Sequence, residues 1–144
     1  MDDAEDILRA VAESLRESGY TAKLREPDAA DPLGGVMDVT GPFGLLQIVN
    51  FGGRFPAVIE DALHLSTLVV REGSPLKLVP IPQLIALKLY AGGMQDLWDI
   101  QQLLALPDAA DLSEQVDEEI ADLPPAAAAT WRTLREHRPQ ADRR

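Results

Sequence analysis

The sequence predicts an α+β fold in which helices pack on a mixed or antiparallel sheet. Strand-like patterns dominate the first half of the chain after one opening helix, helical patterns dominate the second half, and no internal repeat interrupts this order. The length of 144 residues suits one hydrophobic core. We therefore expect one domain over residues 1–106, with residues 107–144 as a C-terminal helical extension of the same domain.

The opening helix is predicted over residues 2–18. Ile7, Leu8, Val11 and Leu15 recur at helical spacing and form one apolar stripe. The acidic residues at its start suit the positive end of a helix dipole. Gly19 follows as a typical residue for ending a helix.

Three strands are expected next. Residues 20–25 and 36–40 alternate between apolar and polar side chains, which indicates half-buried strands. Residues 45–51 form a nearly continuous apolar run, which is typical of a central strand buried on both faces. The string GPFG at residues 41–44, just before this run, predicts a turn. The connections are short, so an antiparallel meander is the natural arrangement.

The remaining segments combine two short strands with several helices. The Gly92-Gly93 pair divides the longest helical pattern, and Pro124-Pro125 divides the C-terminal one. The expected elements are a helix over 54–63, strands over 65–71 and 76–79, helices from Pro82 and over 95–106, and one or two helices within 108–138.

The overall composition limits the classes of function. Hydrophobic residues make up 46% of the chain and charged residues 26%, as in ordinary soluble domains. The net charge of −11 disfavours direct binding of nucleic acid, but it permits a nucleotide held with a metal or a basic protein partner. There is no cysteine, and the apolar runs are short. We therefore expect a cytoplasmic protein with no membrane association.

Lys88, Asp96 and Asp99 are the first candidates for catalysis. Asp96 and Asp99 share one helix face near its N-terminus, and the Gly92-Gly93 break allows Lys88 to fold back towards them. Lys88 could bind the phosphates of a nucleoside triphosphate while a carboxylate holds Mg²⁺. In the structural alternative, Asp96 caps the helix, Asp99 complements the helix dipole, and Lys88 pairs with either carboxylate to fix the corner.

An acidic loop offers a second candidate, a metal site. Asp28, Asp31 and Asp38 surround the Gly34-Gly35 pair, and Asp31 and Asp38 are the candidate ligands. Turn chemistry also accounts for these residues, because Asp and Gly both favour tight turns.

The C-terminal segment is basic although the chain is acidic. The string TWRTLREHRPQADRR carries five arginines, with Trp131 as an aromatic anchor, whereas Trp98 is expected in the core. This helix could dock on an acidic partner or on the chain's own acidic surface. His64 and His137 have no spacing typical of metal ligands or a catalytic pair.

The string LKLVPIPQLIALKLYAGGMQDLWDIQQLL resembles the C-terminal half of the minimal nucleotidyltransferase-like proteins, the AbiEii/AbiGii toxin group. The upstream string GYTAKLREPDAADPLGGVMDV is also similar to a strand–loop–strand segment of that family. The resemblance covers about residues 1–106. The residues that match the family pattern in the first string are Lys88, Ala91, Gly92, Asp96, Leu97, Asp99 and Ile100.

The resemblance implies nucleotidyl transfer from a nucleoside triphosphate by two Mg²⁺ ions held by three carboxylates. Two of these carboxylates lie in an Asp-x-Asp strand that follows a Gly-Ser turn, and this sequence contains no such combination. The strand matched to the third offers only Gln47 and Asn50. We therefore expect a degenerate, non-catalytic member that binds a partner or nucleotide in a toxin–antitoxin or defence setting.

Two alternatives stay open from the sequence. One is an active Mg²⁺-dependent nucleotidyltransferase that uses Asp31 and Asp38 together with Asp96. The other is a plain protein-interaction module that forms a homo-oligomer through a sheet edge or the C-terminal helix.

Overall fold

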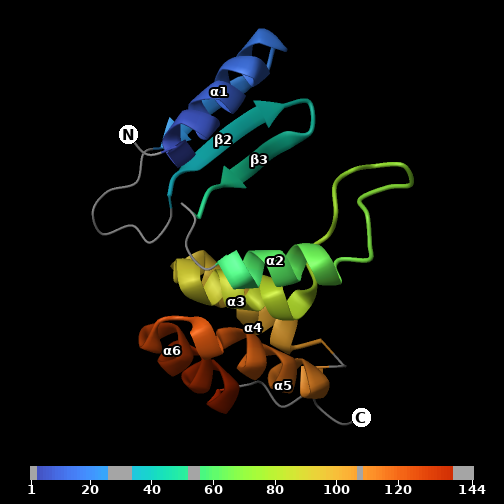
Figure 1. Ribbon diagram of the computed structural model, residues 1–144. Coiled ribbons are helices and arrows are strands. Elements are labelled where there is room, and N and C mark those ends of the chain that lie inside the picture. Colours follow the sequence, from blue (N-terminus) through green and yellow to red (C-terminus); the bar gives the residue numbers. More distant parts are fainter. Residues whose placement is uncertain (1–2, 26–33, 52–55, 107–108, 138–144) are drawn as a thin grey trace. The chain divides into compact units, whose positions relative to one another are not determined.

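The computed structural model describes residues 3–25, 34–51, 56–106 and 109–137 of the chain (Figure 1). The fold is α+β, as predicted, with helices and a three-stranded antiparallel sheet. Two compact units, Met1–Arg54 and Phe55–Arg144, each contain their own hydrophobic cluster. The sequence patterns did not predict a boundary between Arg54 and Phe55. The grouping of residues 1–106 as one domain stays a prediction.

In its described residues, the first unit contains one helix and the three-stranded sheet. Helix α1 (Asp3–Glu17) precedes strands β1 (Thr21–Arg25), β2 (Val36–Gly41) and β3 (Gly44–Val49). Both strand pairs are antiparallel and the spatial order is β1-β2-β3, so the predicted meander is confirmed.

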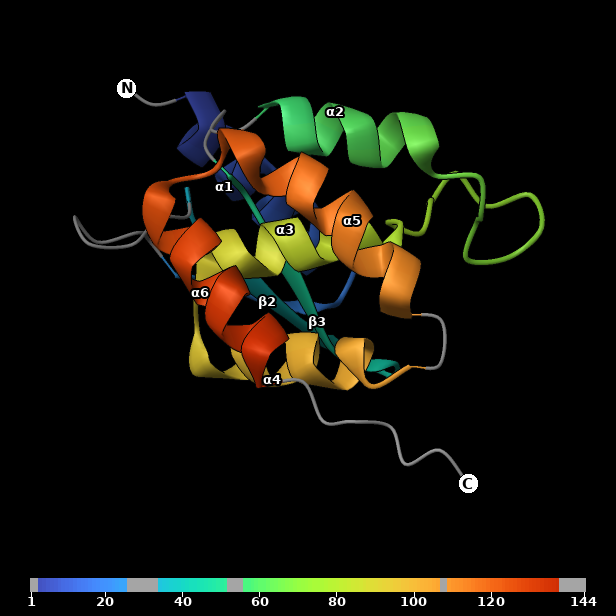
Figure 2. The same cartoon turned by 90° about the horizontal axis from the view of Figure 1, so that it is seen from below.

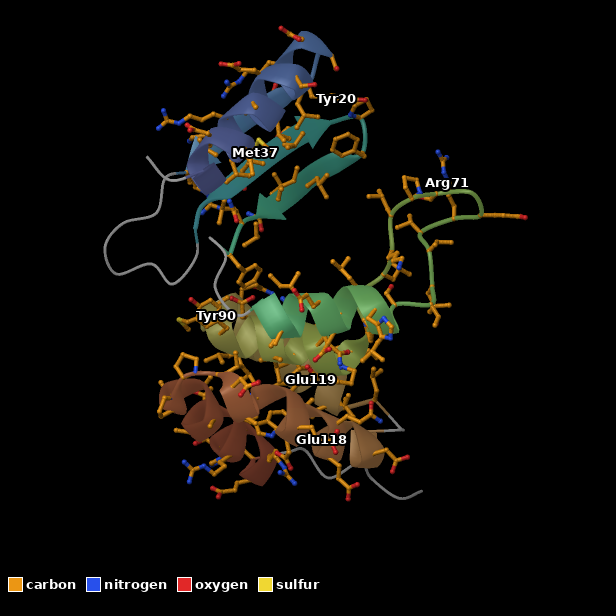
Figure 3. All side chains as sticks on the ribbon, viewed as in Figure 1. Tyr20, Met37, Arg71, Tyr90, Glu118 and Glu119 are labelled. Carbon is orange, nitrogen blue, oxygen red and sulfur yellow. The ribbon has the colours of Figure 1, made fainter. Side chains whose placement is uncertain are left out.

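The core of this unit lies between α1 and one face of the sheet. Leu8 and Ala12 of α1 pack against Ala22 of β1 and against Met37 and Val39 of β2. Figure 3 shows Met37 between the helix and the sheet, where its side chain is fully buried. The alternation of the two strands thus places every second residue under α1.

Residues 45–51 were expected to form a central strand buried on both faces. Within this unit, that expectation is wrong. β3 lies at the edge of the described sheet, and Leu45 is 64% exposed. Ile48 lies opposite Met37 on the face that α1 covers and packs against the core, whereas Val49 lies on the other face. Leu46 lies opposite Val39 on the covered face and is still 51% exposed. An apolar run identifies a strand but cannot tell which neighbours cover it.

The turn between β2 and β3 depends on a close approach at Gly41. A Cβ atom on Gly41 would lie 2.8 Å from the ring of Phe43. The Phe43 ring lies beside Tyr20, with 5.7 Å between the ring centroids. The GPFG turn predicted from the sequence is therefore present, and the missing side chain of Gly41 makes room for this aromatic pair.

The second unit is helical, and α3 lies at its centre. α3 contacts α2, α4, α5 and α6, which surround it (Figure 2). The predicted helices are confirmed, with ends that shift by a few residues. The observed elements are α2 (Pro56–Leu65), α3 (Ile81–Ala91), α4 (Met94–Leu104), α5 (Ala109–Glu119), the short 3₁₀ helix η1 (Ile120–Asp122) and α6 (Pro125–Glu136).

The core of the second unit joins α3 and α4 to the C-terminal helices. Ile85 and Ile100 are fully buried and belong to the same cluster as Trp131 of α6. The expectation that Trp98 lies in the core is wrong. Trp131 is a core residue that donates a hydrogen bond to Asp117 (2.7 Å), whereas Trp98 is 55% exposed because α4 turns Ile100 inward instead.

The two strands expected over 65–71 and 76–79 do not form as regular strands. The structure has one isolated antiparallel bridge between Val69 and Lys77 in this segment. The side-chain oxygen of Ser74 accepts the backbone N–H of Leu76, which removes that amide from the ladder. Residues 66–79, here called the ribbon, expose their apolar side chains, and Arg71 projects from its tip (Figure 3).

Among the described residues, none of the helices combines the length and the apolar character that a membrane span needs.

The two separate clusters predict that each core can be weakened on its own. Ile85→Ala should lower the free energy of unfolding of the second unit by about 3 kcal/mol, because it leaves a cavity at a fully buried site. Met37→Ala should weaken the first unit instead. Amide hydrogen exchange, followed peptide by peptide, separates the two responses. Equal loss of protection in both units from either variant would contradict two separate cores.

Candidate functional site

The candidate site is the corner between α3 and α4. Gly92 ends α3 in the left-handed conformation (φ 67°), and its N–H donates to the carbonyl of Lys88 (2.9 Å). Glycine adopts this conformation without the steric penalty of a Cβ atom. Gly93 then begins α4 with an extended backbone. The chain reverses within two residues and brings the last turn of α3 against the first turn of α4.

This corner brings Lys88, Asp96 and Asp99 together, as the spacing predicts. The Nζ atom of Lys88 lies 2.7 Å from Oδ2 of Asp99 and 3.2 Å from Oδ1 of Asp96. The three side chains are 22%, 27% and 30% exposed for Lys88, Asp96 and Asp99. The ammonium is therefore shared by both carboxylates at a partly shielded position.

The remaining carboxylate oxygens also have partners. Oδ2 of Asp96 accepts the backbone N–H of Gly93 (3.2 Å), and Oδ1 of Asp99 accepts the side-chain amide of Gln95 (2.9 Å). The Asp96 contact is one half of a capping box, because Gly93 has no side chain to return it. The cap by Asp96 and the pairing of Lys88 are the contacts that the structural alternative predicts, whereas the contact between Gln95 and Asp99 was not predicted.

The pKa values of the corner shift in opposite directions. Burial disfavours the charged form of Lys88, but hydrogen bonds and attraction from Asp99 and Asp96 outweigh it and raise the pKa above the usual 10.5. The hydrogen bonds from Lys88 and from Gln95 hold the pKa of Asp99 below the usual 3.8. Both shifts favour the charged pair, so the corner keeps a protonated lysine across the neutral range.

Asp38, a candidate metal ligand, lies on β2 in the first unit. Its carboxylate accepts the amide of Gln47 on β3 (2.8 Å) and pairs with Nε of Arg25 on β1 (3.2 Å). The hydrogen bond from Gln47 and the contact with Arg25 hold the pKa of Asp38 below 3.8, although partial burial opposes this. Asp38 thus joins three strands across the open face of the sheet.

The other acidic residues of the predicted metal site come before β2 in the sequence. Asp28 and Asp31 lie outside the described residues. Within the described ranges, no group of three or more histidine or acidic side chains is arranged to hold a metal ion. Asp38 and Asp96 belong to different compact units, so a shared site for Asp31, Asp38 and Asp96 stays a prediction.

Other candidates from the sequence have structural contacts. Arg135 of the basic C-terminal helix pairs with Asp117 of α5 (2.7 Å) and lies 5.8 Å from the Trp131 ring centroid, while docking of this helix on an acidic partner stays a prediction. Arg138, Arg143 and Arg144 lie outside the described residues. His64 and His137 are exposed at the ends of α2 and α6.

One buried polar contact was missed by the sequence patterns. Gln83 is 3% exposed, and its amide donates to the carboxylate of Glu119 (2.6 Å). Its own Oε1 atom has no hydrogen-bond partner among the described atoms. The available signal was the position of Gln83 three residues before Ala86, on the inward face of α3.

No family model, curated protein or solved structure matches this chain. The resemblance to nucleotidyltransferase-like proteins therefore stays an expectation, and a function has to be inferred from the geometry of the corner itself.

Removing the corner cation should destabilise the second unit moderately. In Lys88→Met, Asp96 and Asp99 face each other without a cation, and two charge-assisted hydrogen bonds are lost. Because solvent screens this partly exposed corner, we expect a loss of about 1 kcal/mol in the free energy of unfolding. Urea unfolding followed by circular dichroism measures it. Lys77→Met is the matched control, since Lys77 donates to the carbonyl of Leu63 and leaves no carboxylate behind.

The same corner predicts how stability depends on pH. The contribution of Asp99 is present above pH 3.8 and is lost as the pH falls through its lower folded pKa. The contribution of Lys88 is present below pH 10.5 and is lost as the pH rises through its higher folded pKa. Urea unfolding across this range should show both slopes. Lys88→Met should flatten both slopes of stability against pH. Unchanged slopes in that variant would show that the Lys88–Asp99 pair does not cause them.

Proposed function

We propose that this chain is a degenerate nucleotidyltransferase-like protein that acts by binding a partner or nucleotide and transfers no nucleotidyl group by itself. The observation that supports this most directly is that Lys88, Asp96 and Asp99 already satisfy one another at the α3–α4 corner. Because of the resemblance, we extend the proposal to a role in a toxin–antitoxin or defence setting.

The corner is poorly suited to the two tasks that transfer requires. A Mg²⁺ ion at Asp96 or Asp99 would have to displace the Lys88 ammonium, which holds one oxygen of each carboxylate. A triphosphate approaching Lys88 would face two carboxylates that already share its charge. Both ligands therefore compete with an ion pair that also fixes the direction of α4.

A direct assay for label transfer tests the proposal. The chain is incubated with each of the four nucleoside triphosphates, labelled at the α-phosphate, together with Mg²⁺ and added protein or RNA. We expect no covalent label on any of them. Transfer that is lost in Asp96→Ala would refute the proposal and favour an active Mg²⁺-dependent nucleotidyltransferase.

A binding measurement with tripolyphosphate tests the competition at the corner. The Asp96→Asn, Asp99→Asn double variant removes both carboxylate charges, so Lys88 should become available and tripolyphosphate should bind more tightly than to the wild type. Adding Lys88→Met to this variant is the control for the general loss of negative charge. The tighter binding should disappear in the triple variant, and its persistence would show that Lys88 is not the phosphate ligand.

A further inference from the structure

Helix α4 has an exposed face that the corner and the core do not use. Its inward side carries Ile100 and Leu104, which are buried. On the opposite side Met94 is 90% exposed and Trp98 is 55% exposed. Three further exposed residues lie on this side at helical spacing. We call the whole set the α4 outer face: Met94, Trp98, Gln101, Gln102 and Ala105.

The α4 outer face carries no charge, although the chain has a net charge of −11. The carboxylate at its border, Asp99, is held by Lys88 and Gln95. In a two-fold symmetric dimer, each surface patch meets the same patch of the second copy. A patch with net charge would therefore face its own sign, whereas this face lets two acidic chains approach without close repulsion.

The chemistry of the face is complementary to itself. Trp98 and Met94 belong to the residue types enriched at protein interfaces, where tryptophan often dominates the binding energy. Gln101 and Gln102 each carry a donor and an acceptor, so the amides of two copies can satisfy one another. A strongly charged partner would find no side chain of opposite sign on this face.

We propose that a second copy of this chain docks on the α4 outer face and forms a two-fold symmetric dimer. An antiparallel pair of α4 helices places the axis between Trp98 and Gln101. Met94 of one copy then lies over the small side chain of Ala105 in the other, and Trp98 lies against Gln101. This pairing fills the space beside Ala105 and covers both tryptophans.

The dimer is expected to be weak. The helix has 11 residues, so the contact is about 16 Å long and falls short of a standard interface of about 800 Å² per partner. The proposal goes beyond the proposed function and does not depend on it, because absence of nucleotidyl transfer neither requires nor excludes a dimer.

The ribbon is the rival surface, since Leu68, Val70 and Leu76 are also exposed there. It carries Arg71, Glu72 and Lys77 among these apolar residues, so pairing with its own copy would bring like charges together in several registers. A test of the dimer must therefore separate the two surfaces.

Light scattering of the full chain from micromolar to millimolar concentration provides the test. The wild-type mass should rise with concentration towards that of two chains. Trp98→Glu should weaken the dimer at least about 30-fold, as expected for a tryptophan at the centre of an interface. Leu68→Glu is the matched control: it adds the same charge at an exposed apolar residue of the ribbon and should leave the equilibrium unchanged.

Three results would overturn the proposal. The wild-type chain could remain monomeric at millimolar concentration. Leu68→Glu could dissociate the dimer while Trp98→Glu does not, which would assign the interface to the ribbon. Both variants could weaken it equally, which would show that association is not specific to α4. Circular dichroism of each variant confirms that helical structure is retained.

Discussion

The ammonium of Lys88, held between the carboxylates of Asp96 and Asp99, fixes the relation between the central helix α3 and the helix after it. α3 contacts each of the other α-helices of its unit, so the direction of α4 decides which of its sides joins the core. With Lys88 paired, Ile100 and Leu104 turn inward and Trp98 turns outward. The α4 outer face is the side opposite Ile100 and Leu104, whose burial sets the rotation of the helix, and the ion pair supports the same arrangement at the corner.

Local patterns predicted the elements well because local physics determines them. The stripe of α1, the alternation of β1 and β2 and the Gly92-Gly93 break each appear where the sequence places them. The spacing of Asp96 and Asp99 also predicted a shared face reachable by Lys88. Which oxygen accepts which donor depends on side-chain packing, and sequence spacing carries no information about that.

Contacts between elements account for the errors. β3 and the ribbon both have a strand-like composition. Among the described residues of its unit, no other element covers the second face of β3, so its apolar residues there are exposed. The ribbon forms a single antiparallel bridge and no regular strands. The expectation that Trp98 lies in the core failed because an aromatic residue suits a core and an interface equally. Only the way α4 and α6 pack against their neighbours distinguishes these environments, and residue type alone does not specify that packing.

Cations are scarce on this chain, with 13 basic residues against 24 acidic ones. The structure uses them within each unit: Arg25 pairs with Asp38, Lys88 with Asp96 and Asp99, and Arg135 with Asp117. An anionic ligand must therefore displace a carboxylate wherever it meets one of these cations. The α4 outer face has no charged side chain, so the docking proposed for it involves no such competition.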